Sequence, residues 1–163
     1  MRSPHPFLLA LAMLIPAAGS AQTKCPWLNE ATARGILGGD VTMTVDTTAR
    51  GDGVCKFSRQ QKTAVFELRI SIAKMNDVAK QFSALLAQCP PKSPPLPAIG
   101  NEAVTCAVEG KDGQYAEKVV GRVRETAFII SVSSSIQEDL QMTKQMLRNK
   151  AILIAEQVAG ILF

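Results

Sequence analysis

The sequence predicts an α+β fold: an antiparallel sheet of about six strands with helices packed on it, in the order α-β-β-β-α-β-β-β-α. Alternating apolar and polar residues mark the strands, and apolar residues at helical spacing mark the helices. The connections are short enough to join antiparallel neighbours. The chain has 163 residues, of which 47% are hydrophobic, enough for one domain with a buried core.

The first half of the chain predicts one helix followed by three strands. Asn29 is a suitable N-cap for the helix, and Gly38-Gly39 offers the left-handed backbone at which such helices end. Apolar side chains alternate along each strand segment, with Cys55 and Phe57 on the inward side of the second. The expected elements are a helix over 30–37 and strands over 41–48, 54–59 and 64–73.

The second half repeats this order and ends in a long helix. A helix that begins at Asn76 or Asp77 runs to Cys89, and the proline-rich segment 90–97 then forms an extended surface connector. A strand between Gly100 and Gly110 precedes two more, and the closing helix carries an apolar stripe that includes Leu147, Ile154, Val158 and Ile161. The remaining expected elements are strands over 114–124 and 127–133 and a helix over 137–163. The recurring order suggests two similar α-β-β-β units.

Residues 1–21 have the composition of an export signal, which leaves residues 22–163 as one domain. Arg2 supplies the positive charge, an apolar run covers 7–15, and small residues precede the expected cleavage after Ala21, with Ser20 as the alternative. The run is too short to span a membrane, and we expect no transmembrane anchor. Lys24 stands where a lipoprotein signal has a small residue, so we expect no lipid on Cys25.

Four cysteines in an exported chain indicate disulfide bonds. The residues are Cys25, Cys55, Cys89 and Cys106, and three pairings are possible. We favour the sequential pairing of Cys25 with Cys55 and Cys89 with Cys106, because each bond would then link the surroundings of a helix to the middle of a strand. The cysteine spacing includes no Cys-x-x-Cys, which argues against a redox site and against a zinc site.

Histidine chemistry is excluded from the expected mature protein. The single histidine, His5, lies in the export signal, so catalytic triads, histidine general bases and histidine-ligated metals cannot occur. We therefore expect no enzyme, metal or cofactor, and interpret the chain as an exported binding or accessory module of the cell envelope. The alternatives are a histidine-free enzyme that uses Lys, Asp or Glu, and a secreted inhibitor or structural partner.

Three basic residues form the candidate binding surface. Lys118, Arg122 and Arg124 alternate with apolar neighbours, so they would project from one face of a strand, with Arg69 and Arg59 on neighbouring strands. Such a row could bind an anion, and the expected partner is an envelope protein or a small anionic ligand. Removal of Arg2 lowers the net charge from +4 to +3, too little to indicate nucleic-acid binding.

Several short motifs resemble a family of secreted bacterial domains of unknown function, best known among actinobacterial lipoproteins. The motifs are Cys25-Pro-Trp-Leu-Asn-Glu-Ala, the Leu37-Gly-Gly helix ending, Cys55-Lys-Phe and Pro97-Ala-Ile-Gly-Asn-Glu-Ala. The resemblance covers residues 25 to about 160 in element order. It implies a fold similar to the PsbP-like α-β-α sandwich and a non-catalytic binding or accessory role. The chain differs from the family at Ala98 and Asn101, where Gly and Asp are usual.

Overall fold

The computed structural model describes residues 24–110, 114–136 and 142–163, and the expected signal segment 1–21 lies outside this part. Within it, the predicted α+β class and six-stranded antiparallel sheet are confirmed. The elements are α1 (Glu30–Leu37), β1 (Thr42–Thr47), β2 (Gly53–Gln61), β3 (Ala64–Lys74), α2 (Val78–Leu86), β4 (Glu102–Glu109), β5 (Tyr115–Val123), β6 (Thr126–Ser134) and α3 (Lys144–Leu162).

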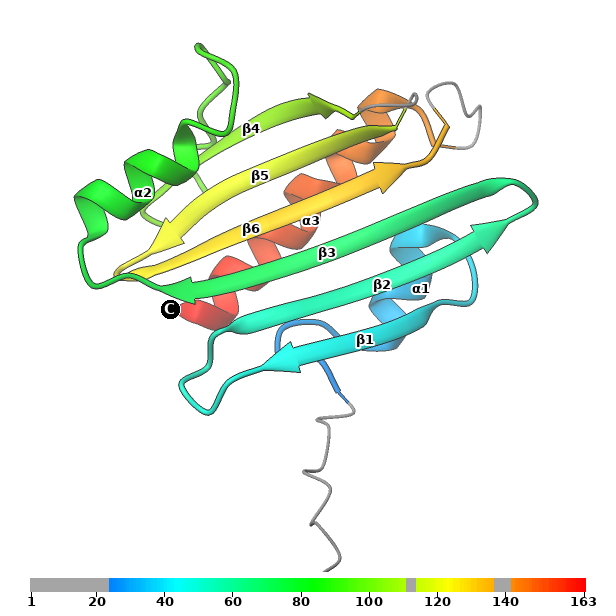
Figure 1. Ribbon diagram of the computed structural model, residues 1–163, viewed down its shortest axis with the longest axis horizontal. Coiled ribbons are helices and arrows are strands. Elements are labelled where there is room, and N and C mark those ends of the chain that lie inside the picture. Colours follow the sequence, from blue (N-terminus) through cyan, green and yellow to red (C-terminus); the bar gives the residue numbers. More distant parts are fainter. Residues whose placement is uncertain (1–23, 111–113, 137–141) are drawn as a thin grey trace, which may run out of the picture.

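The sheet consists of two three-stranded meanders joined along their inner strands. Its order is β1-β2-β3-β6-β5-β4, and every neighbouring pair is antiparallel. The join is the long β3–β6 pairing, in which Ile70 lies opposite Ile130. The two halves of the chain therefore share one continuous sheet (Figure 1).

Two of the helices pack on one face of the sheet, and the third packs on the other face. Helices α1 and α3 share one face, and they enclose the main core with the inward side chains of β2, β3, β5 and β6. Helix α2 lies on the other face, where Phe82 packs in a smaller cluster with Val120 and Ala127 (Figure 1). The suggested repeat is thus limited to element order, because α1 and α2 cover different faces of the sheet.

The main core is built from alternating strand residues. Strand β3 buries Phe66, Leu68 and Ile70 completely against α1 and α3, as its period-two pattern predicts. On β5, Gly121 lies against the ring of Phe128, and a Cβ atom at this position would overlap that ring. The glycine therefore makes room for a large aromatic side chain at the centre of the core.

Capping at both ends fixes α1 as the sequence predicts, and a contact with α3 adds to it. The Asn29 side chain accepts a hydrogen bond from the Thr32 amide at 2.8 Å, and Gly38 ends the helix with φ 79°. The Lys150 ammonium of α3 donates to the carbonyl of Ile36 near this end of α1. Burial lowers the pKa of Lys150, and the contact ties α1 to α3.

Two helix boundaries differ from the prediction. Helix α2 ends at Leu86 rather than at Cys89, because the chain turns before Pro90. Helix α3 begins at Lys144, where the Thr143 side chain accepts a hydrogen bond from the Met146 amide. The earlier part of the predicted helix, 137–141, lies outside the described residues. Ile161, expected in the apolar stripe, is 51% exposed.

The proline-rich segment 90–97, which we call the strap, does more than connect two elements. The sequence predicts no pairing with the sheet here, yet the strap joins the outer edge of β4. The Thr105 amide donates to the Pro94 carbonyl at 3.0 Å, and the Leu96 amide donates to the Ala103 carbonyl at 2.8 Å. Proline lacks an N–H but keeps its carbonyl, and Leu96 supplies the donor, so the strap protects part of this edge.

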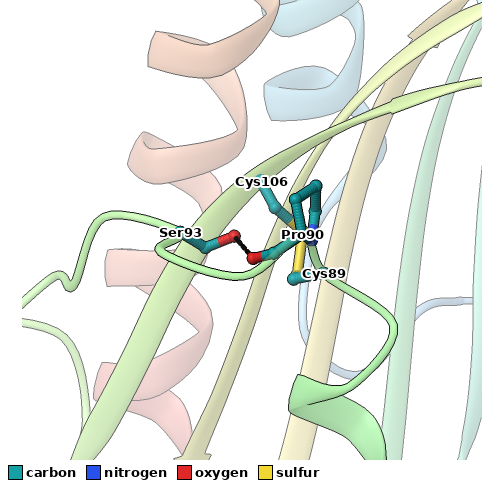
Figure 2. The surroundings of a disulfide bond; sticks show 4 residues. All are labelled: Cys89, Pro90, Ser93 and Cys106. Carbon is teal, nitrogen blue, oxygen red and sulfur yellow. Dashed lines mark hydrogen bonds between the residues drawn. A yellow bond between two sulfur atoms is a disulfide. The ribbon is translucent and has the colours of Figure 1, made fainter.

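Two disulfide bonds attach chain segments to the sheet. Cys25 pairs with Cys55 of β2, and Cys89 pairs with Cys106 of β4, which is the sequential pairing. The Cα atoms are 5.8 and 5.6 Å apart. Figure 2 shows the second bond holding the start of the strap against β4. Among the described residues, no helix is both long and apolar enough to cross a membrane.

Candidate functional site

A polar surface lies on the part of the α2 face that α2 leaves uncovered. Helix α2 lies over the β4–β5 end of this face, whereas β1, β2 and β3 have no helix in front of them in Figure 1. We call this uncovered area the open face. Its small hydroxyl residues are Thr42, Thr44, Ser58, Ser71, Ser131 and Ser133.

Three basic residues cross the open face in one line. The sheet register places Lys56 opposite Arg69, Arg69 opposite Ser131, and Ser131 opposite Lys118. We call Lys56, Arg69 and Lys118 the basic row. Because neighbouring strands are about 4.8 Å apart, the three Cα atoms extend over about 15 Å at right angles to the strands.

The basic row is only partly neutralised. The Lys56 ammonium lies 2.6 Å from a carboxylate oxygen of Glu67 on the neighbouring strand. Arg69 is exposed and Lys118 is half-buried, and neither forms an ion pair in the described part of the chain. The row therefore presents unpaired positive charge among hydroxyl groups that can donate hydrogen bonds, a combination that suits anionic groups.

Of the predicted surface Lys118, Arg122 and Arg124, only Lys118 lies in the basic row. The Arg122 guanidinium is 5.7 Å from the centroid of the Phe82 ring of α2, and its Nε lies 3.3 Å from Glu102. Arg124 follows the end of β5 in the turn to β6, with φ 53°. Strand alternation ends before this residue, so the three side chains do not share one surface.

The predicted neighbours of that surface also separate. Arg69 is on the open face, but Arg59 points to the opposite side of the sheet. There its guanidinium donates to the Leu37 carbonyl at 2.6 Å and lies 5.8 Å from the centroid of the Phe66 ring. Sequence reasoning missed Lys56, although its place between the inward residues Cys55 and Phe57 already indicates an outward side chain.

A second polar cluster lies on the other face, at the β4–β5 edge below α3. The Tyr115 hydroxyl donates to the buried carboxylate of Glu117. The Lys144 ammonium is 4.4 Å from the centroid of the Tyr115 ring and 3.3 Å from Glu109. Burial, and then the Glu117 contact, raise the pKa of Tyr115. Such a shift makes the hydroxyl a poorer proton donor, which does not favour acid–base catalysis.

The described residues give no indication of a bound metal. Within the ranges 24–110, 114–136 and 142–163, no three His, Cys, Asp or Glu side chains come together in a group that could hold one. All four cysteines of these ranges are paired in the two disulfide bonds.

Comparison with known proteins gives no family assignment: no family model matches the chain, and no curated protein does. The resemblance to secreted bacterial domains therefore stays a prediction.

Proposed function

We propose that this protein is an exported, non-catalytic binding module, and that its basic row binds an acidic partner protein of the cell envelope. The supporting observation is the alignment of Lys56, Arg69 and Lys118 across the open face. Carboxylates of a partner could contact all three side chains at once. Such contacts would fix the orientation of the partner and favour acidic partners over basic ones.

Export is supported by two independent features. The segment 1–21 has the composition of a signal peptide. The two disulfide bonds require an oxidising compartment to form and persist. Together they favour a periplasmic or extracellular location for residues 22–163.

The shape of the open face favours a protein over a small ligand. Small-molecule sites are concave and mostly apolar, with few polar groups. The basic row instead lies on the surface of a sheet, where hydroxyl residues, apolar residues and Glu67 flank it. Its length of about 15 Å matches a patch on a protein surface better than one small anion.

A non-catalytic role is supported by the residues available. The expected mature chain contains no histidine, and the raised pKa of Tyr115 opposes a role in proton transfer. The histidine-free enzyme is the alternative, and it would depend on the Tyr115–Glu117 pair.

The test uses fluorescent poly-L-glutamate as an acidic polypeptide and the chain from residue 22 as the protein. In a K56Q/R69Q/K118Q variant we expect binding to weaken roughly tenfold at low salt, because each exposed charge contact contributes about 0.2–1 kcal/mol. Fluorescence anisotropy measures the affinity. Salt should weaken wild-type binding more than variant binding, since screening acts on the removed contacts.

A matched control removes the same charge from elsewhere. The variant R50Q/K62Q/R124Q also loses three positive charges, but these residues lie in turns outside the open face. We expect it to bind almost as tightly as the wild type. Equal weakening in both variants would mean that only net charge matters, and would contradict the proposal.

A further inference from the structure

A cavity of about 270 Å³ opens between the strap and the edge of the sheet. The strap supplies one wall, with Lys92, Ser93 and Pro94, and α3 contributes Arg148. The opposite wall carries Thr105 of β4 and Glu117 of β5. Both side chains point to the α3 side of the sheet, whereas the side chains of the basic row point to the other side.

The strap wall is held in place by covalent and hydrogen bonds. The Cys89–Cys106 disulfide joins the start of the strap to β4. Figure 2 shows the next turn, where the Ser93 hydroxyl donates to the Pro90 carbonyl at 2.7 Å. The cavity is therefore bounded on this side by a preformed wall, which lowers the entropy lost when a ligand binds.

Thr105 gives the first sign of a missing ligand. Its side chain is 1% exposed, and its hydroxyl oxygen has no hydrogen-bond partner among the described residues. A buried hydroxyl without a partner costs about 1–3 kcal/mol. A valine at this position would have the same shape without that cost, so the hydroxyl is best explained by a ligand group that bonds to it.

Glu117 gives the second sign. Its side chain is 6% exposed, and its hydrogen-bond partner is the neutral hydroxyl of Tyr115. A buried carboxylate is stabilised far more by a cation than by a neutral donor. Ala107 lies opposite Glu117 in the β4–β5 register, and its small side chain leaves room above the carboxylate.

Arg148 of α3 and the exposed Lys92 of the strap supply the positive charges in the lining of the cavity, and Arg148 is the more buried of the two. The Arg148 side chain is half-buried, and it makes no ion pair within the ranges that the structure describes, not even with Glu117. Glu117 and Arg148 thus line the same small space without an ion pair between them. A ligand that carries both an ammonium and a carboxylate would satisfy the two groups together.

We propose that this cavity binds a small zwitterion, namely a free α-amino acid. Arg148 binds the ligand carboxylate, Glu117 accepts hydrogen bonds from the ammonium group, and Thr105 donates to the ligand carboxylate. The volume lies just below the roughly 300–1,000 Å³ of sites for drug-sized molecules, which suits a ligand of few atoms. This inference is independent of the basic row and of its acidic partner.

The experiment titrates the ¹⁵N-labelled chain from residue 22 with each of the L-α-amino acids in turn. Concentrations rise to about 10 mM, at which a site of millimolar affinity is mostly filled. We expect at least one of them to shift the amide signals of Thr105 and Glu117 in a saturable way. The N-acetyl and the amide derivatives of the best binder each lack one charge, and both should bind at least tenfold more weakly.

Three variants test the assigned contacts. E117Q and R148Q should each weaken binding at least tenfold, and T105V by roughly fivefold. E117Q keeps an oxygen acceptor for the Tyr115 hydroxyl, so its thermal transition should remain close to that of the wild type. The controls E125Q and R124Q change charges in the β5–β6 turn and should leave the affinity unchanged.

Two results would overturn the proposal. One is the absence of a saturable shift with any of the amino acids tested. The other is wild-type affinity in both E117Q and R148Q, which would place the ligand elsewhere. Neither result would bear on the basic row, since poly-L-glutamate binding is measured on the opposite face.

Discussion

A chain truncated after Lys150 is expected to show no cooperative thermal transition. The deletion removes the part of α3 that closes the main core, where Ile154 and Val158 are completely buried. Burial of each such side chain contributes about 1.5–3 kcal/mol, and the cavity left behind adds to the loss. A whole domain is stable by only about 5–15 kcal/mol. Circular dichroism during heating of residues 22–150 measures the result.

The control for this experiment is a shorter deletion. Truncation after Gly160 removes Ile161 and Phe163, which are 51% and 60% exposed, together with the partly buried Leu162. We expect this chain to keep its cooperative transition with a modest fall in Tm. A retained transition in the chain that ends at Lys150 would show that α3 is not essential to the core.

Removal of the Cys25–Cys55 bond should cause the second large loss of stability. This bond closes an interval of 30 residues, and loop entropy gives it about 3–4 kcal/mol of stabilisation. The C25A/C55A variant should therefore lose that amount in urea unfolding. The C89A/C106A variant, with an interval of 17 residues, should lose about 3 kcal/mol.

Combining all four substitutions should leave the chain largely unfolded, since the joint loss approaches the whole stability of a small domain. The control is the wild-type chain under reducing and non-reducing conditions. If the reductant cleaves both bonds and leaves the urea midpoint unchanged, the disulfides do not stabilise this fold.

Local patterns in the sequence predict the strands and the first helix well. The alternation along β3 identifies its buried face, and the Asn29 and Gly38 signals identify both ends of α1. These features depend on residues that are close in the sequence, so local backbone geometry is enough to interpret them. For the same reason the sequence predicts the fold class and the presence of a sheet, but it does not predict on which faces of the sheet the helices pack.

The arrangement of α2 could not be predicted in this way. Its apolar stripe shows that one side is buried, but the stripe has the same form whichever face of the sheet it covers. The face that α2 covers affects the candidate site, because Phe82 of α2 packs against Arg122. The cavity is a similar case, since Thr105, Glu117 and Arg148 come from three elements that only the folded chain brings together.

An NMR titration with poly-L-glutamate that follows the arginine Nε–Hε signals tests most directly whether the basic row is the binding surface. Arg69 and Arg59 lie on neighbouring strands of the same sheet, but they point to opposite faces. We predict that the Arg69 signal shifts in a saturable way, whereas the Arg59 signal stays in place. A shift of Arg59 without a shift of Arg69, or no shift of Arg69 at saturating polymer, would contradict the account.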